Sequence, residues 1–78
     1  MNLIGRRAKI LVATDPTQVG LSGELLLERS KTLQLESHGR RLTIQKLGTV
    51  IELAGTREVI RGDDILGRVE ERIARVAS

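Results

Sequence analysis

The central segment of the chain reads TLQLESHGRRLTIQ, from Thr32 to Gln45. Apolar and polar residues alternate on both sides of His38-Gly39, which is the pattern of two strands that bury one face and expose the other. A glycine in so short a connection favours a tight turn. We therefore expect an antiparallel hairpin around His38-Gly39, at the centre of a mainly β fold.

Short apolar runs continue on either side of this hairpin, and turn residues separate them. Six strands are expected, over residues 8–14, 24–28, 32–36, 41–45, 49–53 and 57–61. Gly20 and Gly23 bracket the start of the second strand, where glycine permits a sharp bend or a close approach of two backbones. Six short strands with tight connections predict a small, strongly bent antiparallel barrel, because closure removes exposed strand edges.

The two ends of the chain differ from this pattern. Four apolar residues near the carboxy terminus are three or four positions apart: Leu66, Val69, Ile73 and Val76. This spacing predicts a short helix over residues 64–76, with Asp63 or Asp64 as its cap. Residues 1–7 are too few to order independently and are expected to form a flexible segment. The whole chain, residues 1–78, is expected to be one domain, since so short a chain can close only one core.

Apolar side chains at both ends suggest a contact with another protein. Leu3 and Ile4 lie outside the predicted barrel, and the stripe that includes Val69 and Ile73 is wide enough to leave an edge uncovered. We therefore predict Leu3, Ile4, Val69 and Ile73 to be partner-binding residues.

The composition excludes several kinds of chemistry. The 78 residues include no Cys and one His, so disulfides, Cys-based zinc sites and thiol nucleophiles are absent. No apolar run is long enough to span a membrane, and the chain does not begin with the pattern of a signal peptide. The protein is expected to be soluble and cytoplasmic, with no membrane partner.

The charge favours a polyanion as the partner. Thirteen Lys and Arg residues outnumber ten Asp and Glu residues, which gives a net charge of +3 and an isoelectric point of about 10.2. No Phe, Trp or Tyr is available for base stacking, so RNA would be held mainly through its phosphates. The positive charge concentrates in two clusters, and we predict their members to be RNA-binding residues: Arg6, Arg7 and Lys9 near the amino terminus, and Arg40, Arg41 and Lys46 around the hairpin.

Several short motifs follow one another in a characteristic order. They are Asn2-Leu3-Ile4-Gly5, Val19-Gly20-Leu21-Ser22-Gly23, Thr32-Leu33-Gln34-Leu35, Gly48-Thr49-Val50-Ile51-Glu52-Leu53, and the ending from Gly62-Asp63-Asp64 to Arg72-Ile73. In this order and spacing, over nearly its whole length, the chain resembles the archaeal ribonuclease P protein component 1 family.

The resemblance implies both a fold and a function. Such proteins have an Sm-like, strongly bent barrel and are subunits of the ribonucleoprotein that removes the 5′ leader from precursor tRNA. The catalytic group there is RNA with bound Mg²⁺, so this chain would be no enzyme by itself, have no catalytic or metal-binding residues and bind no cofactor. Its partners would be the ribonuclease P RNA, precursor tRNA and a small zinc-ribbon protein subunit, and the free chain would be a monomer.

Two other functions remain open. A general Sm-like RNA-binding scaffold would assemble into homo-oligomeric rings through open strand edges. A metal-dependent nuclease would use the adjacent carboxylates of Asp63 and Asp64 to hold Mg²⁺, although helix capping accounts for this pair with fewer assumptions.

Overall fold

The computed structural model describes residues 3–71 of the chain. It contains six principal strands: β1 (Arg7–Val12), β2 (Ser22–Glu28), β3 (Thr32–Ser37), β4 (Arg40–Gln45), β5 (Val50–Leu53) and β6 (Val59–Arg61). Two short 3-10 turns, η1 (Pro16–Gln18) and η2 (Gly62–Ile65), and a seventh strand, β7 (Glu70–Glu71), complete the described chain. All six predicted strands are confirmed. No helix within residues 3–71 has the length and apolar character needed to cross a membrane.

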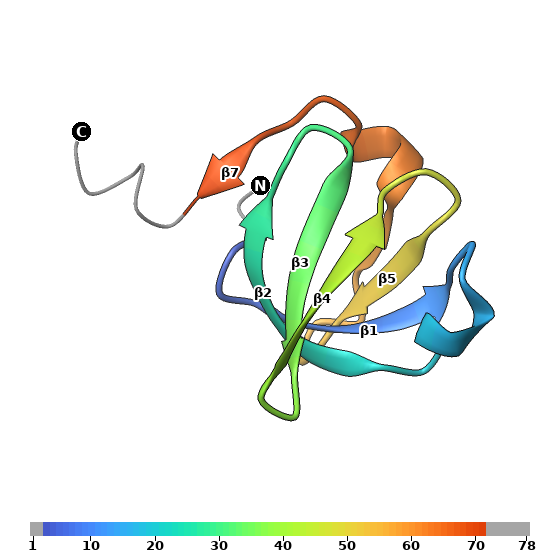
Figure 1. Cartoon of the computed structure of the whole chain (residues 1–78), viewed down its shortest axis with the longest axis vertical. Helices are drawn as coiled ribbons and strands as arrows, with labels where there is room; N and C mark the ends of the chain where they lie inside the picture. The colour runs from blue at the N-terminus through green and yellow to red at the C-terminus, as the bar shows by residue number, and fades with distance from the viewer. Residues whose placement is uncertain (1–2, 72–78) are drawn as a thin grey trace.

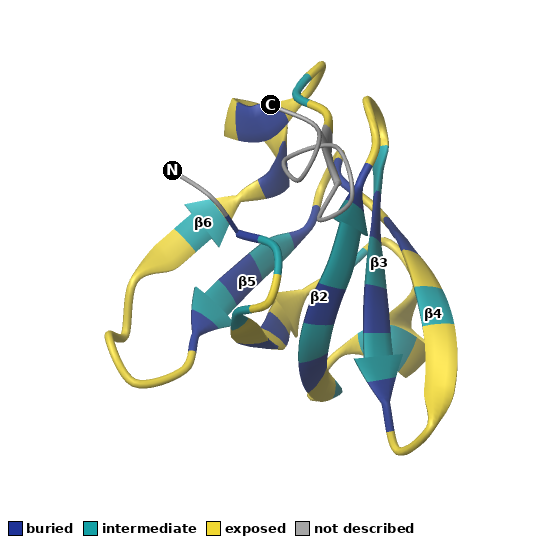
Figure 2. Cartoon of the chain, turned by 90° about the vertical axis from the view of Figure 1, so that its left-hand side faces the viewer, coloured by how far each residue is buried: buried dark blue, intermediate teal, exposed yellow. Residues whose placement is uncertain are grey.

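The strands form one bent antiparallel sheet that curls around a single core (Figures 1 and 2). Their order is β4-β3-β2-β1-β5-β6, and β7 pairs separately with β2. The register shifts between Ile10 and Val12 in β1 and between Leu25 and Leu27 in β2. Irregularities of this kind bend a strand and increase its twist, which allows so small a sheet to close.

The hairpin of β3 and β4 has the expected register. Thr32 pairs with Gln45 at one end, and Ser37 pairs with Arg40 at the other. The two turn residues, His38 and Gly39, have φ values of 52° and 77°. Positive φ at both positions is the requirement of a type I′ turn, whose twist matches that of the strands.

Gly23 provides a close contact between neighbouring strands. A Cβ at this position would overlap the backbone oxygen of Glu36 in β3. The close backbone approach expected at Gly23 is therefore confirmed, and only glycine allows β2 and β3 to come so near at this bend.

The apolar part of the core is entirely aliphatic. Its buried apolar residues are Leu3, Ala8, Ile10, Leu25, Leu33, Leu35, Ile44, Ile51, Leu53 and Ile65. Leu3 is 0% exposed, so the expectation that it lies outside the barrel as a free partner-binding residue is wrong. A leucine that comes before the first strand thus helps to fill a core without aromatic side chains.

The predicted carboxy-terminal helix is reduced to the 3-10 turn η2, which ends at Ile65, and is wrong over residues 66–71. After η2 the chain extends at Leu66, turns at Gly67 with a φ of 90°, and continues into β7. The Gly67 amide donates to the Ser30 oxygen, and β7 pairs with β2 at Leu27 and Glu28. An available sheet edge therefore outweighs a helical spacing of apolar residues. The rest of the predicted helix, including Ile73, lies outside the described residues.

Candidate nucleic-acid interface

The amino-terminal basic cluster lies on the outer face of β1. Arg7 and Lys9 are exposed, whereas Ala8 and Ile10 between and after them are buried, as strand alternation requires. Arg6 precedes the strand and is half-buried. This cluster thus presents two fully accessible cations and one partly accessible cation.

The second cluster lies at the start of β4, next to the hairpin turn. Arg40 and Arg41 are both exposed. Arg41 shares the outer face of the strand with Thr43 and Gln45, which are also exposed. Because β4 is one end of the sheet order, these side chains stand at a strand edge.

The sheet register relates the two clusters to one another. Arg7 pairs with Glu24, Glu24 pairs with Glu36, and Glu36 pairs with Arg41, so these four residues form one row across β1 to β4. Directly paired residues share a face of the sheet, and three strand spacings amount to about 14 Å. Arg7 and Arg41 therefore lie on one outer face, with two half-buried glutamates between them, whereas Arg40 pairs with Ser37 and is directed to the other side of β4.

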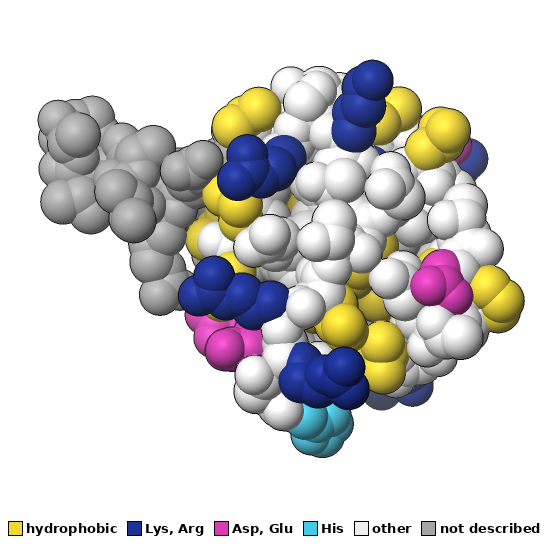
Figure 3. Space-filling view, in the orientation of Figure 1, with side chains coloured by type: hydrophobic (Ala, Val, Ile, Leu, Met, Phe, Trp, Pro, Cys, Tyr) yellow, Lys and Arg dark blue, Asp and Glu magenta, His cyan; other side chains and the backbone are white. Residues whose placement is uncertain are grey.

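Other basic residues that are close in sequence lie elsewhere. Arg29 and Lys31 are exposed in the connection from β2 to β3, and the Lys46 amide donates to the Lys31 oxygen. They are therefore at the opposite end of the hairpin from Arg40 and Arg41. On the side of the molecule that Figure 3 shows, Lys and Arg side chains are distributed over the surface rather than gathered in one patch.

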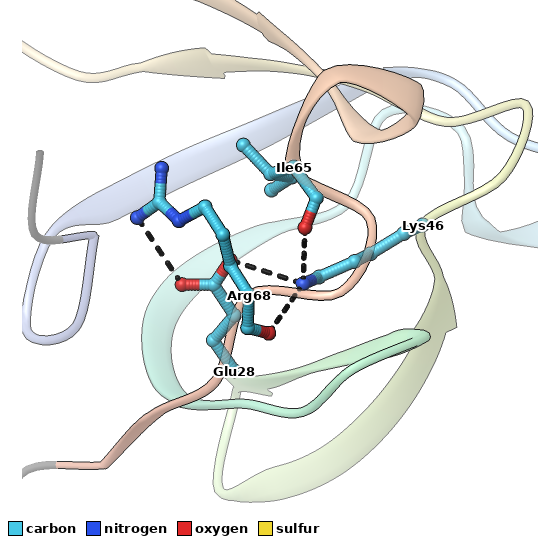
Figure 4. A network of polar contacts seen from close by, with 4 residues as sticks. All are labelled: Glu28, Lys46, Ile65 and Arg68. Carbon is cyan, nitrogen blue, oxygen red and sulfur yellow. Dashed lines mark hydrogen bonds and ion pairs between the residues drawn. The ribbon is translucent and has the colours of Figure 1, made fainter.

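Lys46 has a different environment from the other predicted RNA-binding residues. Its side chain is 0% exposed, and Nζ lies 3.0 Å from Oε2 of Glu28, which is also 0% exposed. Nζ also donates to the backbone oxygens of Ile65, at 2.7 Å, and Arg68, at 2.9 Å. Figure 4 shows these contacts converging on the ammonium group. The prediction that Lys46 binds RNA is wrong, because its ammonium group is buried and is held by one ion pair and two hydrogen bonds inside the protein.

The buried pair joins three parts of the chain. Glu28 ends β2 and Lys46 follows β4, while the two carbonyl groups belong to Ile65 at the end of η2 and to Arg68 in the connection to β7. Oε2 of Glu28 meets the ammonium as a close ion pair without a directional hydrogen bond, and Oε1 lies 3.4 Å from Nη2 of Arg68. Removing one partner would leave a buried charge, so this network holds the carboxy-terminal segment against the barrel.

Asp63 and Asp64 have no built metal site around them. Both are exposed in η2, and Oδ1 of Asp63 accepts a hydrogen bond of 2.9 Å from the Gly48 amide. Among residues 3–71, no group of three or more His, Cys, Asp or Glu side chains is placed to hold a metal ion. Asp63 thus ties η2 to the turn between β4 and β5.

The remaining predicted partner-binding residues differ in exposure. Ile4 is half-buried, and Val69 is 63% exposed. Sequence reasoning did not find the small pocket beside the hairpin turn, which is lined by Leu21, Ser37, His38, Arg40 and Leu42. The sequence signal for this pocket was Ser37, a polar residue at a position of β3 where the alternation predicts an apolar one.

The sequence is similar to known proteins over nearly its whole length. A family model described as ribonuclease P/MRP, subunit p29, matches residues 1–75. Similar proteins named ribonuclease P protein component 1 occur in Desulfurococcus amylolyticus, at 39% identity over 96% of this chain and 86% of the relative, and in Staphylothermus marinus, at 38% identity over 95% and 85%. The relative from Hyperthermus butylicus is 34% identical over 96% of this chain and 71% of its own length. The resemblance noted from the motifs is confirmed, and the chain belongs to the ribonuclease P/MRP subunit p29 family.

Proposed function

We propose that this chain is an RNA-binding, non-catalytic subunit of ribonuclease P that assists the catalytic RNA in removing the 5′ leader of precursor tRNA. Family membership supports the subunit role. The observation that carries RNA binding is the row across β1 to β4, which has an exposed arginine at each end. Its partners are the ribonuclease P RNA and precursor tRNA, and its place is the cytoplasm.

The cations of this face are available to phosphates. None of Arg6, Arg7, Lys9, Arg40 and Arg41 forms an ion pair with a carboxylate of residues 3–71. Glu24 and Glu36 lie between the two groups and repel phosphate there. The RNA backbone therefore contacts the protein at two separate places, and the protein responds to RNA shape more than to base sequence.

Salt dependence of RNA binding tests this function directly. The double variants Arg7→Ala with Lys9→Ala and Arg40→Ala with Arg41→Ala are each compared with the native chain in binding to ribonuclease P RNA. Each lost phosphate contact should lower affinity and reduce the slope of log K against log salt by up to about 0.9. Arg61→Ala, an exposed arginine of β6, serves as the control. An unchanged slope in both double variants would exclude this face as the interface.

The catalytic group is the RNA, and this chain binds no metal of its own. The purified protein with precursor tRNA and Mg²⁺ should release no leader until the catalytic RNA is added. Asp63→Asn with Asp64→Asn should then alter stability more than the activity of the reconstituted particle. If the protein alone cleaved precursor tRNA, and the two Asp→Asn substitutions abolished that cleavage, the nuclease alternative would be established.

The second protein partner is the zinc-ribbon subunit. Val69 supports this proposal, because it is the most exposed large apolar side chain of residues 3–71. Hydrogen exchange should slow near Ile4 and Val69 when the zinc-ribbon subunit is added to the full chain. Size-exclusion chromatography of the free protein should give a monomer, whereas a mass several times larger would favour the ring-forming scaffold.

A further inference from the structure

A small pocket lies beside the turn of the β3–β4 hairpin. Its volume is about 220 Å³, and its lining consists of Leu21, Ser37, His38, Arg40 and Leu42. Figure 3 shows apolar side chains close to a His and a basic side chain at this end of the face. Pockets for drug-sized ligands begin at about 300 Å³. The volume here fits a single ring system with its polar substituents.

Ser37 lines this pocket, and its hydroxyl oxygen is buried behind the pocket surface. The buried face of β3 carries Leu33, Leu35 and then Ser37, so a serine occupies the third core-facing position. Ser37 is 5% exposed, and its Oγ is buried without a hydrogen-bond partner within the described structure. Such atoms are rare, because a buried polar group without a partner costs free energy.

His38 is the only ring-bearing side chain that this chain has for stacking, because Phe, Trp and Tyr are absent. It has a φ of 52° at the first position of a type I′ turn, where Asn and Gly are favoured. Unpaired RNA bases stack on imidazole rings and on guanidinium planes. His38 and Arg40 supply one of each at the same pocket.

We propose that this pocket binds one unpaired nucleotide of the RNA. The base lies against Leu21 and Leu42 and stacks on His38. Its polar edge bonds to Oγ of Ser37, which is buried in the free chain and turns toward the pocket when the nucleotide binds, and Arg40 pairs with the adjacent phosphate. The proposal rests on the RNA-binding function above and adds to it a site for single-stranded RNA. Duplex RNA has no free base to offer, so it engages only the cations of the outer face.

Nuclear magnetic resonance of the full chain, with labelled leucine methyl groups, tests this assignment. The probes are single-stranded pentanucleotides of each of the four bases, an RNA duplex, inorganic tripolyphosphate and a pentaglutamate peptide. At least one pentanucleotide should shift the methyl signals of Leu21 and Leu42, whereas the duplex and the tripolyphosphate should leave them in place. Shifts caused by the peptide and by no RNA would overturn the proposal and assign the pocket to an acidic protein segment.

Two variants separate binding at the pocket from stability. His38→Asn suits the turn, and Ser37→Ala removes a buried hydroxyl without a partner, so both should maintain or raise the urea midpoint. Each should nevertheless weaken pentanucleotide binding, by about fivefold or more for the stacking residue, and leave duplex binding unchanged. Ser30→Ala, at the exposed opposite end of the hairpin, should change neither property.

The outcomes distinguish this site from the proposed function. Unchanged pentanucleotide affinity in both folded pocket variants would overturn the nucleotide site, while salt-dependent binding of ribonuclease P RNA would still stand. If the chain bound none of the RNAs, both the nucleotide site and the proposed RNA-binding function would be excluded.

Discussion

Replacing Lys46 by Met should destabilise the protein strongly without removing an RNA contact. The substitution keeps a long apolar side chain and eliminates the ammonium group. It breaks the 3.0 Å ion pair with Glu28 and the two hydrogen bonds to the Ile65 and Arg68 oxygens. The Glu28 carboxylate would remain 0% exposed, with Arg68 at 3.4 Å as its remaining described cation.

The expected loss follows from this geometry. Removing one partner of a buried ion pair costs about 3–5 kcal/mol, because the other charge remains in the interior. Domains of this kind have a total stability of about 5–15 kcal/mol, so the variant should unfold far more readily. Glu28→Leu combined with Lys46→Met should recover part of the loss, since no buried charge then remains.

Urea unfolding followed by far-ultraviolet circular dichroism measures the effect, because the chain has no Trp or Tyr fluorescence. Lys31→Met, at an exposed lysine, is the matched control and should change stability by no more than about 0.5 kcal/mol. In RNA binding under conditions where all variants are folded, Lys46→Met should leave the salt slope unchanged. A loss below about 1 kcal/mol together with a lower salt slope would refute the interior role of Lys46.

Three further substitutions follow from particular contacts. Gly23→Ala should destabilise the protein by about 1–3 kcal/mol or more in urea unfolding, because its Cβ would overlap the Glu36 oxygen; native stability would contradict the close approach of β2 and β3. Glu36→Gln should raise RNA affinity by removing a negative charge between the basic clusters, with exposed Glu58→Gln as the control; equal affinity would mean that RNA does not cross this row. Hydrogen bonds from the Thr17 hydroxyl and amide lower the pKa of Asp15, so its stabilisation is present above the unfolded value near pH 4 and is lost as the pH falls through the lower folded pKa. The urea midpoints of the native chain and Asp15→Ala should therefore differ at neutral pH and converge in acid, and a constant difference would count against this linkage.

The sequence alone predicted the strands and the hairpin because these depend on local periodicity. Alternation from Thr32 to Gln45 determines which residues face the core, and the glycine after His38 supplies the turn. The same alternation places Lys46 in phase with Leu42 and Ile44, on the inner face of β4. The alternation therefore indicates that Lys46 is buried, but a buried lysine is rare without a partner, and the sequence pattern does not identify that partner.

The partner became visible only in the tertiary structure. Strict alternation after Leu25 would bury Leu27, but the register shift in β2 turns Glu28 inward instead, where it meets Lys46. The carboxy-terminal segment was decided in the same way, because its apolar spacing fits a helix while β2 offers hydrogen bonds to a strand at Leu27 and Glu28. A bulge and an available strand edge depend on how distant segments pack, so local sequence patterns do not predict them.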